Sequence, residues 1–213
     1  MPEHIIVKNG GEGLYEEKKS RFIARVYSVE SESEAAAHIE AVRKKYWDAR
    51  HNCYAFVIGE NNGLTRCSDD GEPSGTAGKP ILEVITGAGV HNCLVIVTRY
   101  FGGTLLGTGG LVRAYTKAAK EALSDSSLAL VVPGALYRVV TDYNGVGKVQ
   151  YAAASLEAEI RDSVYSDKVE LAIAVKADMG GRLCAAITEN TNGRAVITKD
   201  CDLPIEIQYN IDA

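Results

Sequence analysis

The sequence has 213 residues, of which 24% are charged and 46% hydrophobic, and it carries a formal net charge of −5. This composition argues against a disordered chain and against a globally basic nucleic-acid binder, and no apolar run approaches the roughly 20 residues of a membrane span. The first residues lack the basic and apolar segments of a secretory leader, so we expect a cytoplasmic protein that has no membrane partner.

Charge and cysteine content narrow the class of protein further. The five cysteines are odd in number and widely spaced, which favours reduced thiols over a disulfide framework. Up to Ala135 the chain has 15 Lys and Arg against 16 Asp and Glu, whereas the remainder has 8 against 12. Basic clusters lie at Lys18–Arg25 and Arg43–Arg50. We favour two solvated faces for these clusters over a groove that follows a phosphate backbone.

The first third of the chain predicts alternating strands and a helix. We expect a strand over Glu16–Val29, where apolar and basic residues alternate. Ser31 and Glu34 form a capping box that begins a helix, and His51–Ile58 is the next strand. The apolar stripe of that helix consists of Ala35, Ile39, Val42 and Tyr46.

The middle of the chain holds its most specific stretch. Turn residues occur at Asn61-Asn62-Gly63, and the polar, glycine-rich segment Arg66–Lys79 predicts an exposed loop long enough to be functional. Pro80–Ile85 fits either a strand or the start of a helix. The stretch Leu94–Tyr115 then predicts a strand buried on both faces, a loop with five glycines, and a helix that begins near Gly110.

The succession of predicted strands and helices begins again near Pro133-Gly134, so we predict two domains, residues 1–134 and residues 135–213. The second domain shows a βαββαβ order, which is typical of a ferredoxin-like sandwich, and Leu203–Tyr209 could add an edge strand. The predicted elements are a strand Leu136–Thr141, a helix Val146–Ala158, strands Ile160–Tyr165 and Val169–Val175, a helix Gly181–Thr191 and a strand Ala195–Thr198. The fold class is therefore α+β, with two α/β sandwich domains.

The glycine loop lacks both standard nucleotide motifs. No lysine and hydroxyl follow it as in a P-loop, and Val112 stands where a dinucleotide fingerprint needs its third glycine. A non-standard phosphate nest and a tight turn that packs a helix on a sheet both remain open. In the nest, Arg99 or Arg113 would supply charge, and N–H donors would come from Gly102, Gly103, Gly107, Gly109 and Gly110.

The loop before it is acidic. Asp69, Asp70 and Glu72 lie within four residues, so their mutual repulsion must be offset by a cation, an arginine or solvent. The spacing does not match an EF-hand, and we favour an ion pair with Arg66 or Arg99 over a magnesium site. We predict no metal and no cofactor.

The triplet His51-Asn52-Cys53 recurs as His91-Asn92-Cys93. Two His and Cys pairs could form a tetrahedral zinc site, but no Cys-x-x-Cys motif is present, and we favour buried cysteines. A nucleophilic Cys53 or Cys67 with His51 as its base is a weaker interpretation, since nothing in the sequence shows that thiol and imidazole meet.

Three ordered motifs resemble the signature of the IMPACT/YigZ family. They are His51-x-Cys53-x-Ala55, the run Asp69–Leu82 with Ser74 and Thr76, and the run Arg99–Tyr115. The resemblance covers about Gly13–Ser124. The rest of the chain resembles the ferredoxin-like domain of bacterial members, which is similar to the last domain of elongation factor G.

The resemblance implies an N-terminal domain with a left-handed βαβ crossover, similar to domain 2 of ribosomal protein S-five. Eukaryotic members regulate translation by binding the activator of an initiation-factor kinase, which restrains the stress response. These 213 residues contain no counterpart of the extra N-terminal domain of those members, so that role is not carried over directly.

What the resemblance carries over is a binding surface for RNA, the ribosome or a translation-associated protein, with no established catalytic residues. The sequence does not predict the oligomeric state. The alternative is a phosphate-handling or hydrolytic enzyme that uses the glycine loop and the acidic loop. The predicted binding residues are His51, Asp69, Asp70, Glu72, Ser74, Thr76, Arg99, Tyr100, Gly102, Gly103, Gly107, Gly109, Gly110 and Arg113.

Overall fold

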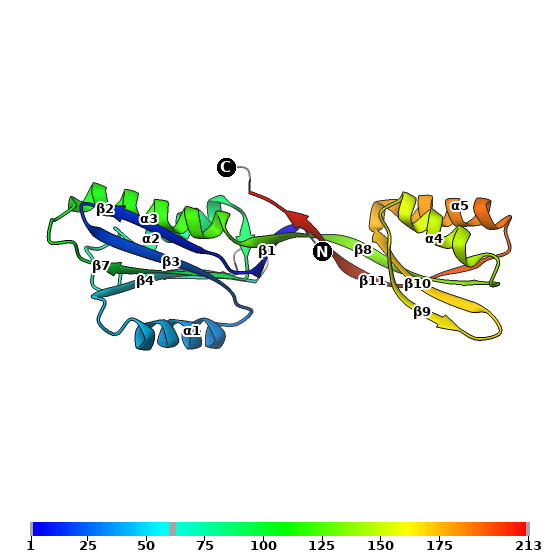
Figure 1. The fold of residues 1–213 in the computed structure, drawn as a ribbon, viewed down its shortest axis with the longest axis horizontal. Helices are drawn as coiled ribbons and strands as arrows, with labels where there is room; N and C mark the ends of the chain where they lie inside the picture. Colours follow the sequence, from blue (N-terminus) through cyan, green and yellow to red (C-terminus); the bar gives the residue numbers. More distant parts are fainter. Residues whose placement is uncertain (1, 60–62, 212–213) are drawn as a thin grey trace. The chain divides into compact units, whose positions relative to one another are not determined.

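The computed structural model describes residues 2–59 and 63–211, so the predicted turn at Asn61-Asn62-Gly63 lies outside the described residues except for Gly63. The chain forms two compact units. The N-terminal unit is His4–Leu130 with Gln208–Ala213, and the C-terminal unit is Val131–Ile207 with Met1–Glu3. Each unit has a sheet with helices packed on it (Figure 1), which confirms the mixed α/β fold in two parts.

The N-terminal unit is built on a five-stranded sheet with the order β2-β3-β7-β4-β5. Helix α1 covers one face of this sheet, and α2 and α3 cover the other (Figure 1). Strands β1 and β6 pair in parallel outside this five-stranded sheet. The elements are β1 His4–Asn9, β2 Glu12–Glu17, β3 Ser20–Ser28, α1 Glu32–Lys45, β4 His51–Ile58, β5 Leu64–Ser68, α2 Gly78–Gly87, β6 Val90–His91, β7 Cys93–Tyr100 and α3 Gly107–Ser124.

The register of the sheet brings three strand ends together. Arg99, near the end of β7, pairs with His51 at the start of β4, and Tyr100 pairs with Arg21 near the start of β3. Antiparallel neighbours place the start of one strand beside the end of the next. The first residues of β3 and β4 therefore lie beside the glycine loop that follows β7.

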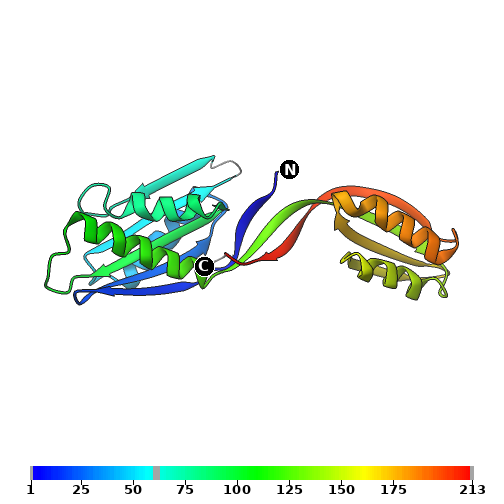
Figure 2. The same ribbon diagram turned by 90° about the horizontal axis from the view of Figure 1, so that it is seen from above.

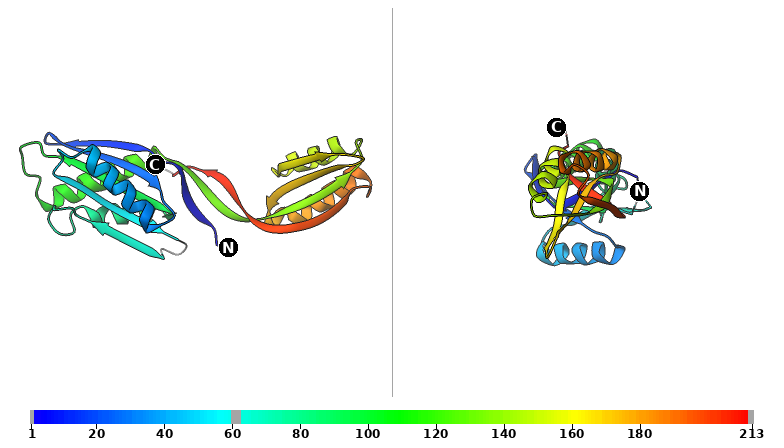
Figure 3. Two further views of the ribbon diagram at one scale, coloured as in Figure 1. Left: turned by 90° about the horizontal axis from the view of Figure 1, so that it is seen from below. Right: turned by 90° about the vertical axis from the view of Figure 1, so that its right-hand side faces the viewer.

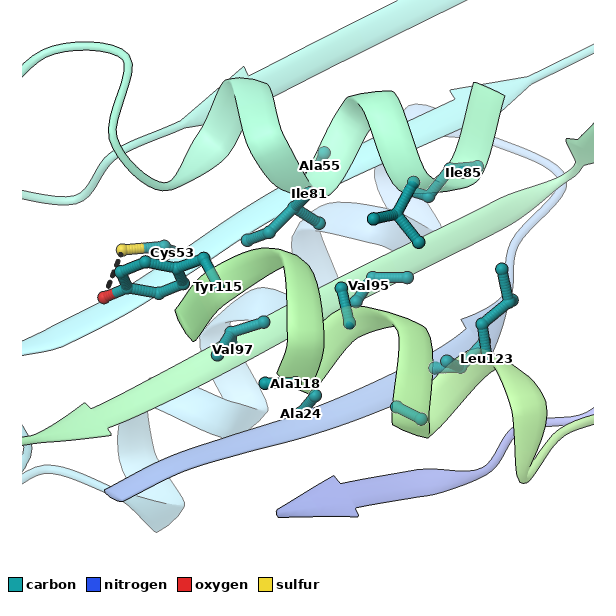
Figure 4. Packing of buried hydrophobic residues seen from close by; sticks show 14 of the residues in the cluster. Ala24, Cys53, Ala55, Ile81, Ile85, Val95, Val97, Tyr115, Ala118 and Leu123 are labelled. Atoms are coloured by element: carbon teal, nitrogen blue, oxygen red, sulfur yellow. Dashed lines mark hydrogen bonds between the residues drawn. The ribbon is translucent and has the colours of Figure 1, made fainter. Parts of the chain in front are cut away.

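Two apolar layers enclose the sheet. The layer under α2 and α3 includes Ile81 and Tyr115 (Figure 4), and the layer under α1 includes Ile39 and Ile96. Strand β7 is buried from Cys93 to Arg99, as the unbroken β-branched run predicts. At about 25 cal/mol per Å² of buried apolar area, these layers provide most of the stabilisation of the unit.

The C-terminal unit has the predicted βαββαβ order. Its strands lie in the order β11-β8-β10-β9, and α4 and α5 together cover one face of the sheet (Figures 2 and 3). This is the ferredoxin-like arrangement expected from the sequence. The elements are β8 Ser127–Thr141, α4 Val146–Ser155, β9 Glu159–Tyr165, β10 Val169–Lys176, a 3₁₀ turn Ala177–Met179, α5 Gly180–Thr191 and β11 Val196–Tyr209.

Three predicted elements differ from the structure. The single strand expected over Glu16–Val29 is part of a hairpin, with Lys18 and Lys19 at φ of 46° and 65° in its turn. Turn residues with positive φ are usually glycine or asparagine, and lysine rarely adopts this conformation. The two lysines therefore do not reveal the turn in the sequence. Strand β8 runs through Pro133-Gly134, where the sequence pattern restarts, and the two short strands predicted after Ala195 form one strand, β11.

The segment Arg66–Lys79 is not a wholly exposed loop. Its first residues belong to β5, and α2 begins at Gly78, which also settles Pro80–Ile85 as helix. Glu72 and Thr76 are buried. The prediction failed because side chains within the segment satisfy its backbone groups, so it can pack against the sheet without water.

Within the described ranges, no helix combines the length and the apolar character that crossing a membrane would require.

Candidate binding cleft

A cleft of about 420 Å³ lies where β4 begins and β7 ends. Its polar lining comes from β4, from the acidic loop and from the end of β7, and its apolar lining comes from the glycine loop and α3. We call it the β4–β7 cleft. Its lining residues are Arg50, His51, Glu72, Pro73, Arg99, Phe101, Leu105, Leu106, Gly107, Thr108 and Leu111.

A buried ion pair forms the polar part of the lining. Nη1 of Arg99 lies 2.6 Å from Oε1 of Glu72, and only 6% and 8% of these two residues is exposed. The hydroxyl of Tyr115 donates to the same oxygen at 2.8 Å, and Nε2 of His51 lies 3.9 Å from it. The ion pair predicted for the acidic loop is therefore made by Glu72 with Arg99, while Arg66 pairs with Glu32 instead.

Aromatic rings hold the arginine in place. The guanidinium carbon of Arg99 lies 5.4 Å from the ring centroid of Phe22 and 5.7 Å from that of Phe101. Both distances are typical of cation–π contacts, which strengthen when water is excluded. The position of Arg99 is thus fixed by Glu72 on one side and by ring faces on the other.

A second buried group lies behind the ion pair. The Sγ atom of Cys53 is 3.3 Å from the hydroxyl oxygen of Tyr115 (Figure 4) and 3.0 Å from the carbonyl oxygen of Asp69. Burial raises the pKa of the Cys53 thiol and that of the Tyr115 hydroxyl well above their ordinary values. A protonated, buried thiol is a poor nucleophile, so the geometry does not support Cys53 as a catalytic residue.

Asp69 shapes the acidic loop instead of facing the cleft. Its carboxylate accepts hydrogen bonds from the backbone N–H groups of Gly75, Ala77 and Gly78 at 2.8 to 3.0 Å, where α2 begins. Burial would raise the pKa of Asp69, but these three donors outweigh it and bring the pKa below its usual value. Asp69 therefore serves as the cap of α2, whose own N-cap residue, Ala77, has no side-chain cap.

Asp70 ties the same loop to β4 and α1. Its carboxylate accepts from the backbone N–H of Asn52 and from Arg43, both at 2.7 Å. Its carbonyl oxygen lies 2.9 Å from Nδ1 of His51. Because a carbonyl only accepts, Nδ1 carries a proton and orients the imidazole.

The glycine loop combines close packing with open backbone. A Cβ atom at Gly102 would collide with the backbone of Lys19 and Ser20, so this glycine lets the β2–β3 turn approach. Gly103 and Gly107 have φ of 86° and 71°, and no atom lies near their Cβ positions. Helix α3 begins at Gly107 without a side-chain cap, which leaves its first N–H groups for solvent or a ligand.

The structure brings some of the predicted site residues together and separates others. His51, Glu72, Arg99 and Gly107 line the β4–β7 cleft, whereas Asp69 and Asp70 hold the loop. Away from the cleft lining, the hydroxyl of Thr76 bonds to the carbonyl of Pro73, the hydroxyl of Tyr100 bonds to Asp48, and Gly102 packs on the β2–β3 turn. The remaining predicted residues, none of them in the cleft lining, are the exposed Ser74, Gly103, Gly109 and Arg113 and the half-buried Gly110.

The sequence interpretation missed several lining residues. Phe101 and Leu105 are apolar residues in a glycine-rich loop, and that contrast was the available signal. Tyr115 fitted the apolar stripe of α3, so its bond to Glu72 had no signature in the sequence.

The two His-Asn-Cys triplets do not form a metal site. Cys53 and Cys93 are buried, as predicted, and burial raises the pKa of the Cys93 thiol to about 12. His91 contacts the carbonyl oxygen of Gly59 and the ring of His4. Across the described residues, no three His, Cys, Asp or Glu side chains are grouped as metal ligands would be.

Fold and site together define a two-domain α/β protein with a polar cleft in its N-terminal unit. Comparison with known proteins supplies the family. The profile of the Impact N-terminal domain matches residues 18–123, and that of a domain of unknown function, DUF1949, matches residues 139–194. The chain belongs to the IMPACT family.

Its relatives match over most of their length. The IMPACT family member YvyE of Bacillus subtilis is 39% identical over 92% of this chain and 91% of its own, and YigZ of Escherichia coli is 36% identical over 83% and 87%. A solved structure described as that of a hypothetical protein covers 92% of this chain and 97% of its own, with a TM-score of 0.60 at 34% identity. Eukaryotic relatives match a smaller part: Protein IMPACT-B of Xenopus tropicalis is 34% identical over 49% of this chain.

Proposed function

We propose that this chain is a non-catalytic binding protein of the translation machinery, whose N-terminal unit binds RNA, either free or within the ribosome. The single observation that carries the proposal is a set of exposed cations around the β4–β7 cleft. They are Lys18 and Lys19 in the β2–β3 turn, Arg50 before β4 and Arg113 on α3. In the described part of the chain, no carboxylate lies within ion-pair distance of any of the four.

Exposed apolar side chains accompany these cations. Phe101 and Leu105, at the mouth of the cleft, are 43% and 83% exposed, and Trp47, between α1 and β4, is also highly exposed. Proteins that bind single-stranded nucleic acid combine cations that neutralise phosphates with aromatic rings on which bases stack. Membership of the IMPACT family adds support, because translational regulation is the role that the family resemblance implies.

The proposal is tested by titrating a single-stranded RNA across a range of salt concentrations. We expect binding that weakens steeply with salt, with log K falling by about 0.7 per phosphate contact for each unit of log salt. The variant Lys18→Gln/Lys19→Gln should reduce that slope. The matched control Lys148→Gln/Lys168→Gln, in the acidic C-terminal unit, should leave it unchanged.

Either of two results would overturn the proposal. One is the absence of binding at low salt, to RNA and to ribosomes in co-sedimentation. The other is an equal loss of binding in the two double variants, which would mean that the cations around the cleft have no special part.

The alternative, a phosphate-handling or hydrolytic enzyme, keeps one supporting observation. Glu72 and His51 both line the β4–β7 cleft, where a carboxylate or an imidazole could act as a general base. Asp69 and Asp70 are engaged by their own chain, which removes two of the three carboxylates that this alternative assigned to a cation or a base. Turnover of a phosphate ester that is lost in Glu72→Gln and in His51→Gln would favour the enzyme.

A further inference from the structure

The polar part of the β4–β7 cleft leaves two hydrogen-bond acceptors unused. The hydrogen bonds to the Glu72 carboxylate from Arg99 and Tyr115 both fall on Oε1. In the described chain, no group donates to Oε2, and Oε2 is not among the fully buried atoms without a partner, so it keeps some accessible surface on a residue that lines the cleft. His51 donates through Nδ1, which makes Nε2 the ring nitrogen that can accept a hydrogen bond when the imidazole carries one proton.

One buried donor in the cleft lining also lacks a partner. Within the described residues, Nε of Arg99 is buried and has no hydrogen-bond acceptor. Buried polar groups in native proteins nearly always have partners, so an exception calls for an explanation. Arg99 lines the cleft, so an acceptor group of a ligand is one partner that could satisfy this donor.

The mouth of the cleft has the opposite polarity. Gly107 and Thr108, in the first turn of α3, present backbone N–H groups at the positive end of the helix dipole, and Arg50 lies on the same lining. These groups favour an anion. Phe101 and Leu105 add a flat ring and an apolar chain to the wall, which suit the face of a heterocyclic base.

We propose that the β4–β7 cleft binds one unstacked nucleotide of an RNA strand. The phosphate lies on the first turn of α3 and Arg50, the base lies along Phe101 and Leu105, and an amino group of the base donates to Glu72 Oε2 and His51 Nε2. Bases that carry an exocyclic amino group are therefore preferred over uracil. The inference rests on the proposed function, since it specifies which part of the RNA the N-terminal unit contacts.

The size of the cleft fits this occupant. Its volume of about 420 Å³ falls within the range of roughly 300 to 1,000 Å³ that is usual for small-molecule sites. Exposed donors, a buried carboxylate and an apolar wall in one cleft match a molecule that carries both a phosphate and an amino-substituted ring.

The test compares binding of cytidine 5′-monophosphate, uridine 5′-monophosphate and inorganic phosphate to the full chain, followed by NMR chemical shifts. We expect the cytidine nucleotide to bind at least about threefold more tightly than the uridine nucleotide, as one additional hydrogen bond predicts. Inorganic phosphate should bind more weakly than either. Equal affinity for the two nucleotides, or for cytidine nucleotide and phosphate, would overturn the inference.

Two variants on the exposed wall test the position of the base. Leu105→Ser and Phe101→Leu should each weaken binding of the cytidine nucleotide severalfold, because they remove surface from the exposed wall. Leu105→Ser is the cleaner of the two, since Phe101→Leu also removes a ring contact with Arg99. Leu14→Ser is the matched control, an exposed leucine on β2 outside the cleft lining, and should have no effect. Unchanged affinity in both wall variants would contradict the assignment.

A third variant tests the acceptor. Glu72→Gln replaces one carboxylate oxygen with an amino donor, so the preference for cytidine over uridine should disappear or reverse, provided that the NMR spectrum shows the native fold. An unchanged preference in the folded variant would also contradict the assignment.

Failure of the inference is distinguishable from failure of the proposed function. If polyuridine binds with a steep salt dependence while the mononucleotide preferences are absent, the RNA-binding role stands and the cleft assignment falls. If the cytidine nucleotide binds as predicted and no RNA binds at low salt, the cleft is a nucleotide site and the RNA-binding role falls.

Discussion

Each unit of this protein is a sheet covered by helices, but the two units differ in what they bury. In each unit, a pair of helices covers one face of a sheet over an apolar core. The described buried polar residues of the C-terminal unit are two threonines, Thr141 and Thr191, whereas the N-terminal unit buries the charged pair Glu72 and Arg99. The charged contacts of the C-terminal unit, such as Arg138 with Glu170 and Asp200, are exposed.

This contrast separates what the fold requires from what the site requires. Removing two charges from water costs several kcal/mol per ion, and an apolar pair of similar volume is often as stable. The C-terminal unit shows that a helix-covered sheet can do without such a pair. The buried pair of Glu72 and Arg99 is therefore not a requirement of a helix-covered sheet.

The largest expected effect comes from breaking the buried pair. Glu72→Ala should destabilise the N-terminal unit by about 3–5 kcal/mol, because it leaves the Arg99 guanidinium buried without its carboxylate. Urea unfolding monitored by circular dichroism measures the change. The double variant Glu72→Leu/Arg99→Met should recover much of the lost stability. A double variant less stable than Glu72→Ala would contradict this, because it would show that burying the arginine without its carboxylate costs little.

The cap of α2 should give the next effect. Asp69→Ala should cost about 2 kcal/mol at neutral pH, since three backbone donors lose a charged acceptor. The pKa of Asp69 is lowered on folding, so this stabilisation is present above the unfolded pKa of about 3.9 and is lost as pH falls through the folded value. The stability difference between the two proteins should therefore shrink in acid; a difference that stays constant with pH would contradict the role of the charge.

Removing one hydroxyl should have a smaller effect. Tyr115→Phe takes away the donor to Glu72 Oε1 and the partner of the Cys53 thiol while keeping the ring. We expect a loss of about 1–1.5 kcal/mol in thermal or urea unfolding, the usual net contribution of a hydrogen bond. No measurable loss would mean that Arg99 alone satisfies the carboxylate.

The smallest effect is expected in the C-terminal unit and completes the comparison. Arg138→Ala removes contacts to Glu170 and Asp200 that are exposed and screened by solvent, so it should change the free energy of unfolding far less than Glu72→Ala does. The same unfolding measurement applies. A loss as large as that of Glu72→Ala would erase the distinction between the two units.

Patterns local in sequence were predicted well. The predicted cap of α1 is present, with Ser31 accepting from the Glu34 N–H, while the Glu34 carboxylate accepts from the N–H of Glu30, one residue before the N-cap. The buried strand before the glycine loop and the βαββαβ order of the C-terminal unit also followed from periodicity. Each of these elements could be predicted from its own residues, because hydrophobic spacing and caps act over a few residues.

The candidate site was predicted in part. The sequence pointed to the acidic loop and the glycine loop, and the register of β4 against β7 brings parts of both to one cleft. The sequence could not show which role each of the three neighbouring carboxylates has. Asp69 caps a helix, Asp70 ties the loop to β4, and Glu72 lines the cleft.

By itself, then, the sequence determined the family, the order of most elements and the two loops that contribute to the cleft. Only the tertiary structure decided which side chains meet: Glu72 with Arg99 across 27 positions, and Tyr115 with Glu72 across 43. Such contacts depend on strand register and on the helix that packs over it, and no local pattern in the chain encodes a distance between segments that far apart.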